Sequence, residues 1–126
     1  MSNVPDHLRY TAEHEWLRLE ADGTATIGIT DHAQAALGDV TFIDLPKEGA
    51  SFARGAVFGA VESVKAASDL YCPVAGTVVA ANADLNAAPD LVNREPYGGA
   101  WMIRLKVANP DELAGLLDAA GYQKLL

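Results

Sequence analysis

The chain has 126 residues, 50% of them hydrophobic, so it is long enough to bury a core of its own without metal ions or disulfides. Its single cysteine, Cys72, has no partner for an internal disulfide, which is typical of proteins in a reducing compartment. The formal net charge of -8 argues against nucleic acid as a partner, because nucleic-acid binding needs Lys and Arg to neutralise phosphates.

The N-terminal residues 1–10, MSNVPDHLRY, have neither the basic start nor the apolar centre of a secretory signal. No apolar run approaches the length needed to cross a bilayer. We therefore expect a single domain over residues 1–126 that is cytoplasmic, monomeric and not bound to membranes. Its acidic surface favours partners with basic docking patches.

The first predicted elements are two antiparallel strands. Residues 16–20 (WLRLE) and 24–29 (TATIGI) flank Ala21-Asp22-Gly23. An Asp-Gly pair between two such runs is a strong hairpin signal.

A short helix is expected next, over residues 31–37 (DHAQAAL). Thr30 and Asp31 offer an N-cap, Gln34 lies three residues after Asp31, and Gly38 follows the last apolar residue. A further strand is expected at residues 40–45, ending before Pro46.

The centre of the chain indicates short strands interrupted by glycine and proline, at residues 51–53, 56–64, 70–74, 77–81 and 101–108. Residues 82–99 contain two prolines and two glycines and are expected to form an ordered loop. Many short strands without alternating long helices favour a mainly β fold, a sandwich or flattened barrel.

The C-terminal segment is expected to form one helix. Asn109 is a suitable cap, Pro110 fits the first helical position, Asp111 and Glu112 lie in the first turn, and Gly121 follows LAGLLDAA.

Lys65 is one of only four lysines, and it lies where the strands at 56–64 and 70–74 must reverse. The centre of this reversal has no Gly, Asn or Pro, so turn propensity does not explain its residues. The neighbouring residues are small, which leaves the amine accessible: Ser63, Ala66, Ala67 and Ser68.

A Schiff-base role for Lys65 is disfavoured, because Glu62 and Asp69 lie nearby in sequence and stabilise the charged ammonium. An accessible lysine between small and acidic residues is better suited to modification by another enzyme. Cys72 precedes Pro73 in an apolar run and is expected to be buried.

The stretch VESVKAASDLYCPVAGTVV, at residues 61–79, resembles the hairpin of lipoyl-carrying domains. More specifically, the chain resembles the glycine cleavage H-protein family. The resemblance covers roughly nine-tenths of the chain and includes YTAEHEW, GTATIGITDHAQAALGDVTFIDLP, LVNREPYGGAWMIRLK and PDEL. It implies the biotinyl-lipoyl type of flattened β-barrel or sandwich.

Two related families fit less well. Biotin domains centre on a lysine between methionines, whereas the methionines here are Met1 and Met102. Lipoyl domains of 2-oxoacid dehydrogenases generally have Asp before the lysine, where this chain has Val64, and they lack the HEW segment.

The resemblance implies that Lys65 carries lipoate in amide linkage, attached by lipoate-attaching enzymes. It further implies a carrier that catalyses no step itself. Such a carrier receives an aminomethyl group from glycine decarboxylase (P protein), delivers it to aminomethyltransferase (T protein), and passes electrons to dihydrolipoyl dehydrogenase (L protein).

Glu15 and Asp69 match the acidic positions that shelter the loaded arm in this family. A protonated amine needs carboxylates near it, because charge-assisted hydrogen bonds are the strong ones. Family members often have Gly-Glu-Gly-Trp before the last strand, whereas this chain has Gly98-Gly99-Ala100-Trp101 and so lacks one acid there.

The remaining candidates are expected to be structural: His14 as a packing or capping residue, and Trp16 and Trp101 as core residues. No nucleophile-base pair or metal-ligand constellation indicates an enzyme. The alternative to a glycine cleavage carrier is a module of the same fold that donates lipoyl groups to other enzymes or is unmodified.

Overall fold

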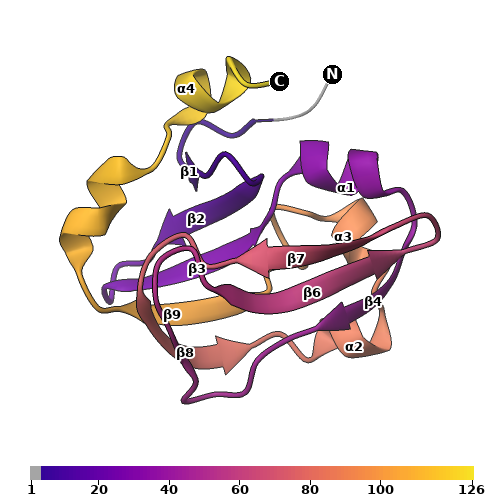
Figure 1. Cartoon of the computed structure of the whole chain (residues 1–126), viewed down its shortest axis with the longest axis horizontal. Helices are drawn as coiled ribbons and strands as arrows, with labels where there is room; N and C mark the ends of the chain where they lie inside the picture. The colour runs from indigo at the N-terminus through magenta and orange to yellow at the C-terminus, as the bar shows by residue number, and fades with distance from the viewer. Residues whose placement is uncertain (1–3) are drawn as a thin grey trace.

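The computed structural model describes residues 4–126 as two antiparallel sheets packed face to face (Figure 1). The larger sheet has the spatial order β1-β2-β3-β9-β8-β5, formed by β1 Arg9–Tyr10, β2 Glu15–Leu19, β3 Thr24–Ile29, β9 Ile103–Val107, β8 Gly76–Ala81 and β5 Ser51–Phe52. The smaller has the order β4-β6-β7, formed by β4 Val40–Asp44, β6 Val57–Ser63 and β7 Ala67–Tyr71. The predicted mainly β sandwich is confirmed.

The predicted internal helix is α1, Asp31–Leu37. Thr30 is its N-cap, and the Thr30 hydroxyl accepts a hydrogen bond from the Ala33 amide at 3.2 Å. The helix ends at Gly38, whose φ of 76° is easily reached only without a Cβ. In Figure 1, α1 lies beside the β6-β7 hairpin.

Residues 82–99 are ordered as predicted but contain two single-turn helices, α2 Asp84–Ala87 and α3 Leu91–Arg94. Their buried residues, Leu85 and Val92, enter the main core. The side-chain amide of Asn82 donates to the carbonyls of Gly99 and Trp101 at 2.9 and 2.7 Å, which fixes the segment. A four-residue helix is too short for a periodic pattern, so the sequence does not reveal it.

The single C-terminal helix expected from the sequence is wrong in its extent. A 3-10 helix, η1 Pro110–Gly115, is followed by extended chain and then by α4 Ala119–Gln123. Leu117 interrupts the helix because its N–H and C=O both pair with the backbone of Tyr10, each bond measuring 2.8 Å. Asp118 then caps α4 by accepting from the Gly121 amide at 2.7 Å.

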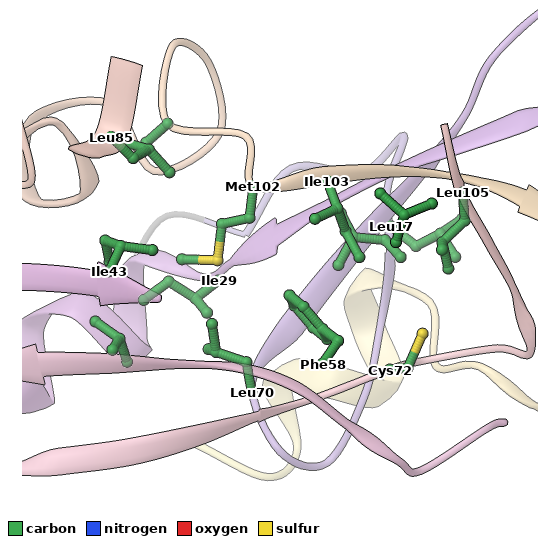
Figure 2. Close-up of a cluster of buried hydrophobic side chains, with 14 of the residues drawn as sticks. Leu17, Ile29, Ile43, Phe58, Leu70, Cys72, Leu85, Met102, Ile103 and Leu105 are labelled. Atoms are coloured by element: carbon green, nitrogen blue, oxygen red, sulfur yellow. The ribbon is translucent and has the colours of Figure 1, made fainter. Parts of the chain in front are cut away.

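The main core fills the space between the sheets (Figure 2). Cys72 is buried there as predicted, its thiol donates to the Val74 carbonyl at 3.1 Å, and burial raises its pKa to about 11. Both sheets and α2 supply the other large side chains: Leu17, Ile27, Ile43, Phe58, Leu70, Leu85, Ile103 and Leu105.

A second cluster joins the two ends of the chain and consists of Leu8, Tyr10, Trp16, Ala119 and Tyr122. Trp16 is fully buried, as predicted, and its indole N–H donates to the Pro96 carbonyl at 2.9 Å. Trp101 is only partly buried and packs against this cluster. The cluster attaches α4 to the start of the larger sheet, and Figure 1 shows α4 close to β1.

Candidate functional site

The reversal that contains Lys65 runs from Ser63 to Ala66 and is organised by a serine side chain. The Ser63 hydroxyl accepts hydrogen bonds from the amides of Lys65 and Ala66 at 3.3 and 3.1 Å. The Ser63 amide donates to the Ala66 carbonyl at 2.8 Å. Turn chemistry therefore does operate here, through a serine just before the centre of the turn rather than through Gly, Asn or Pro.

Lys65 is exposed at the tip of the hairpin, next to the end of α1. The amide of Val64 donates to the Asp39 carbonyl at 3.0 Å, which fastens the tip to the segment between α1 and β4. The aliphatic part of the Lys65 side chain lies close to Gly38. A Cβ atom at position 38 would be 3.6 Å from Cε of Lys65. In Figure 1 the tip lies beside this segment.

Glu15 opens β2 and is 1% exposed. Its Oε1 accepts a hydrogen bond from the Thr11 hydroxyl at 2.6 Å, and its Oε2 accepts from the Tyr71 amide of β7 at 3.2 Å. Burial raises the pKa of Glu15 to about 7, although the two hydrogen bonds have the opposite effect and lower the pKa. The carboxyl group therefore joins the two sheets and titrates near neutrality.

A cavity of about 150 Å³ lies between α1, the β6-β7 hairpin and the turn before β2. Its apolar wall comes mainly from α1 and from both sheets: Ile29, Ala33, Ala36, Leu37, Val61 and Leu70. Three acidic residues, Glu13, Glu15 and Asp69, line the same space. An apolar wall with acids suits a ligand that combines an apolar body with a cationic group.

The structure brings Glu15 and Asp69 together at this cavity, although they are far apart in sequence. Asp69 is exposed and pairs with Ala60 across the hairpin, four residues after Lys65. The cavity thus adjoins α1, whose C-cap Gly38 lies beside the Lys65 side chain, and the strand that follows Lys65.

A larger cavity of about 300 Å³ adjoins this one and shares Glu13 and Glu15 with it. Its other walls come from residues 10–12, 54–55, 71–73 and 115–117. None of its lining residues belongs to α1 or to the tip of the hairpin. The smaller cavity is therefore the one associated with Lys65.

Sequence reasoning did not single out Glu13, Thr11 or Tyr122. Glu13 could have been noticed, because it alternates with Glu15 in the stretch EHE. Thr11 donates a hydrogen bond to Glu15 across a turn for which the sequence contains no clear turn signal. His14 packs as predicted, with its Nδ1 2.7 Å from the hydroxyl of Tyr122, a contact between residues 108 positions apart.

Within residues 4–126, no helix is both long enough and apolar enough to cross a membrane.

Comparison with known proteins identifies the family. The sequence model of the family described as glycine cleavage H-protein matches residues 8–126. A glycine cleavage system H protein of Opitutus terrae is 65% identical over 126 residues, which are 100% of this chain and 99% of the relative. A glycine cleavage system H protein of Chromobacterium violaceum is 57% identical over 98% of this chain and 97% of the relative.

A solved structure agrees with these relatives. The crystal structure of a glycine cleavage system H protein from Mycobacterium marinum has a TM-score of 0.86 and 34% sequence identity to this chain. The match covers 98% of this chain and 100% of that chain. The hairpin lysine, the acid-lined cavity and these matches lead to one conclusion: this chain belongs to the glycine cleavage H-protein family.

Proposed function

We propose that this chain carries a lipoyl group in amide linkage on Lys65 and serves as the mobile carrier of glycine cleavage. It takes an aminomethyl group from glycine decarboxylase to aminomethyltransferase and passes electrons to dihydrolipoyl dehydrogenase. It catalyses none of these steps. The observation that carries the proposal is an exposed lysine on a serine-organised turn, with its side chain beside Gly38 at the end of α1 and near an apolar cavity lined by acidic residues.

The residues present fit a lipoyl group. Lys65 is exposed beside small residues, so an attaching enzyme has access to its amine. The apolar wall formed by Ala33, Leu37 and Leu70 suits the hydrocarbon part of the arm. When bound, this cofactor supplies a pair of sulfur atoms for group transfer and redox chemistry at the end of a long arm.

The carboxylates of the cavity act on the cargo. Glu15 and Asp69 offer acceptors to a protonated amine, and the buried setting of Glu15 makes such a hydrogen bond stronger than it would be in water. The apolar wall excludes water from the same space. Together these residues protect a hydrolytically fragile cargo between its loading and its transfer.

Attachment to Lys65 also makes delivery local. A tethered group meets a docked active site at an effective concentration that a free reagent does not reach. Docking itself is favoured by the acidic surface, since a net charge of -8 attracts basic patches.

The proposal is tested by the exchange of labelled bicarbonate into glycine, catalysed by glycine decarboxylase with this chain as its carrier. Lipoylated parent chain should support the exchange, whereas unmodified parent and Lys65→Arg should not. If the lipoylated parent gives no exchange but donates lipoyl groups to other enzymes, the glycine cleavage role is refuted and the relay role remains.

A further inference from the structure

Tyr122 of α4 contacts the turn that precedes Glu15. It is fully buried and stacks on Tyr10, with ring centroids 4.7 Å apart and planes 9° from parallel. Its hydroxyl lies 2.7 Å from Nδ1 of His14 and 2.7 Å from the hydroxyl of Thr30. One hydroxyl group thus contacts two segments that are otherwise separate in the chain.

Both segments contribute walls to the acid-lined cavity. His14 stands between Glu13 and Glu15 and lines the cavity itself. Thr30 caps α1, whose residues form the apolar wall. The Thr30 amide also donates to the His14 carbonyl at 3.0 Å, so backbone and side-chain bonds hold the walls together at one place.

His14 has an unfavourable backbone conformation that needs support. Its φ of 70° is the only positive φ of a non-glycine residue among those described in the structure. Residues other than glycine rarely adopt this region, because their Cβ atom comes too close to the following carbonyl oxygen. It is required here because the His14 amide closes a tight turn on the Thr11 carbonyl at 3.1 Å, after which the chain enters β2 with Glu15.

The hydrogen-bond donors and acceptors are consistent with this support. Burial, followed by the nearby His32, lowers the pKa of His14, which favours a neutral imidazole with one acceptor nitrogen. Burial raises the pKa of Tyr122, so its hydroxyl keeps its proton. The Tyr122 hydroxyl donates to one of its two partners and accepts from the other.

We propose that the Tyr122 hydroxyl is a positioning group for the cavity: by binding His14 and Thr30 together, it holds Glu15 buried against α1 and the hairpin. The part of this inference that concerns cargo rests on the proposed function. The part that concerns Glu15 applies to the unmodified chain. An element at the end of the sequence would therefore set the shape of a site built from residues between 13 and 70.

The test compares Tyr122→Phe with Tyr10→Phe. Both variants remove one hydroxyl from the same aromatic stack, but the Tyr10 hydroxyl bonds to the Pro5 carbonyl and not to the cavity. The first measurement is the titration of Glu15 in unmodified protein, followed by NMR of carboxyl-labelled glutamate. Tyr122→Phe should lower the Glu15 midpoint by about half to one pH unit, the equivalent of about one hydrogen bond, as the side chain gains access to water. Tyr10→Phe should leave it in place.

The second measurement is the decay of the aminomethyl cargo on lipoylated protein without the transferase. It should be about three- to tenfold faster in Tyr122→Phe than in the parent or in Tyr10→Phe. An unchanged midpoint and decay in Tyr122→Phe, or equal changes in both tyrosine variants, would overturn the inference. A shifted midpoint with unchanged decay would support the positioning role and count instead against shelter of the cargo in this cavity.

A double variant tests whether the hydroxyl acts through His14. His14→Gly accepts the positive φ but has no imidazole. The shift of the Glu15 midpoint caused by Tyr122→Phe should be smaller in the His14→Gly background than in the parent. Fully additive shifts would show that the hydroxyl does not work through His14, and would overturn that step.

Discussion

Burial gives Glu15 a pKa of about 7, well above its ordinary value of 4.5, and this shift makes the stability of the folded chain depend on pH. Below pH 4.5 the carboxyl is protonated in both the folded and the unfolded chain. Between pH 4.5 and about 7 the unfolded chain loses this proton while the folded chain keeps it, so the free energy of unfolding falls as pH rises. Above that range the contribution is lost.

Glu15→Gln should remove this pH dependence. The stability of the parent relative to the variant should fall by on the order of 3 kcal/mol between about pH 4.5 and about pH 8, because Gln does not titrate. Urea unfolding of both proteins at several pH values measures the difference. A constant difference across the range would show that the pKa of Glu15 is the same in the folded and the unfolded chain.

The arrival of a protonated amine should ionise Glu15, because an adjacent cation lowers the pKa of a carboxyl group. Glu15→Gln and Asp69→Asn should therefore shorten the lifetime of the aminomethyl cargo about tenfold or more, the equivalent of one charge-assisted hydrogen bond. Decay is followed in the absence of the transferase.

Asp44→Asn is the matched control for this experiment, since Asp44 is exposed on β4 and does not line the cavity. Its cargo should decay like that of the parent. Equal lifetimes in all four proteins would reduce Glu15 and Asp69 to structural and surface roles.

At the scale of elements, the β6-β7 turn presents Lys65 and depends on Ser63. Ser63→Ala removes the acceptor for two amides, so it should lower the free energy of unfolding by about 0.5–1.5 kcal/mol and slow lipoyl attachment. Ser51→Ala is the control, because it also removes an exposed hydroxyl group that contacts another residue, Thr77 on β8. Ser51 does not belong to the β6-β7 hairpin, so the rate of lipoyl attachment should be unchanged. Equal attachment rates in the parent and both serine variants would contradict a role for the turn.

Elements with local signals were predictable from the sequence. The hairpin of β2 and β3 was indicated by Asp22-Gly23, and α1 by its cap and Gly38. The single-turn helices α2 and α3 were missed because four residues show no period. The sequence predicts a C-terminal helix that is too long, because its local helix signals are favourable. In the structure, the backbone of Leu117 pairs with Tyr10 instead. A long-range pairing of this kind overrides helix propensity.

The site was predictable only in part, for the same reason. Lys65 was singled out by its accessible surroundings, and the family resemblance indicated Glu15 and Asp69. The sequence gives no sign that Tyr122 reaches His14, because that contact exists only once α4 has packed on the larger sheet. Burial of Glu15 between two sheets likewise depends on the whole fold.

At the scale of the whole molecule, negative charge gathers on the small sheet that carries the hairpin. Asp44, Glu62 and Asp69 are exposed on its three strands, with Asp44 and Asp69 both paired to Ala60 of the central strand. This surface lies beside Lys65, so we expect a partner that binds a lipoyl arm on Lys65 to meet it. Like the net charge of -8, it favours basic partner surfaces.

Loading by glycine decarboxylase should therefore weaken as salt is added. The Debye length shrinks from about 10 Å at 0.1 M salt to about 3 Å at 1 M, which screens attraction between the two proteins. Exchange rates are measured with the carrier below saturation. A rate that stays flat over this range would remove electrostatic steering from the docking step.

The most direct test of the central claim is the intact mass of the protein produced with a source of lipoate, compared among single lysine variants. Parent, Lys47→Arg, Lys106→Arg and Lys124→Arg should each gain the mass of one lipoyl group, and peptide mapping should place it on Lys65. Lys65→Arg keeps the positive charge but has no acylatable amine, so it should gain nothing. A lipoyl mass on Lys65→Arg, or none on the parent, would contradict the assignment of this chain as a carrier through Lys65.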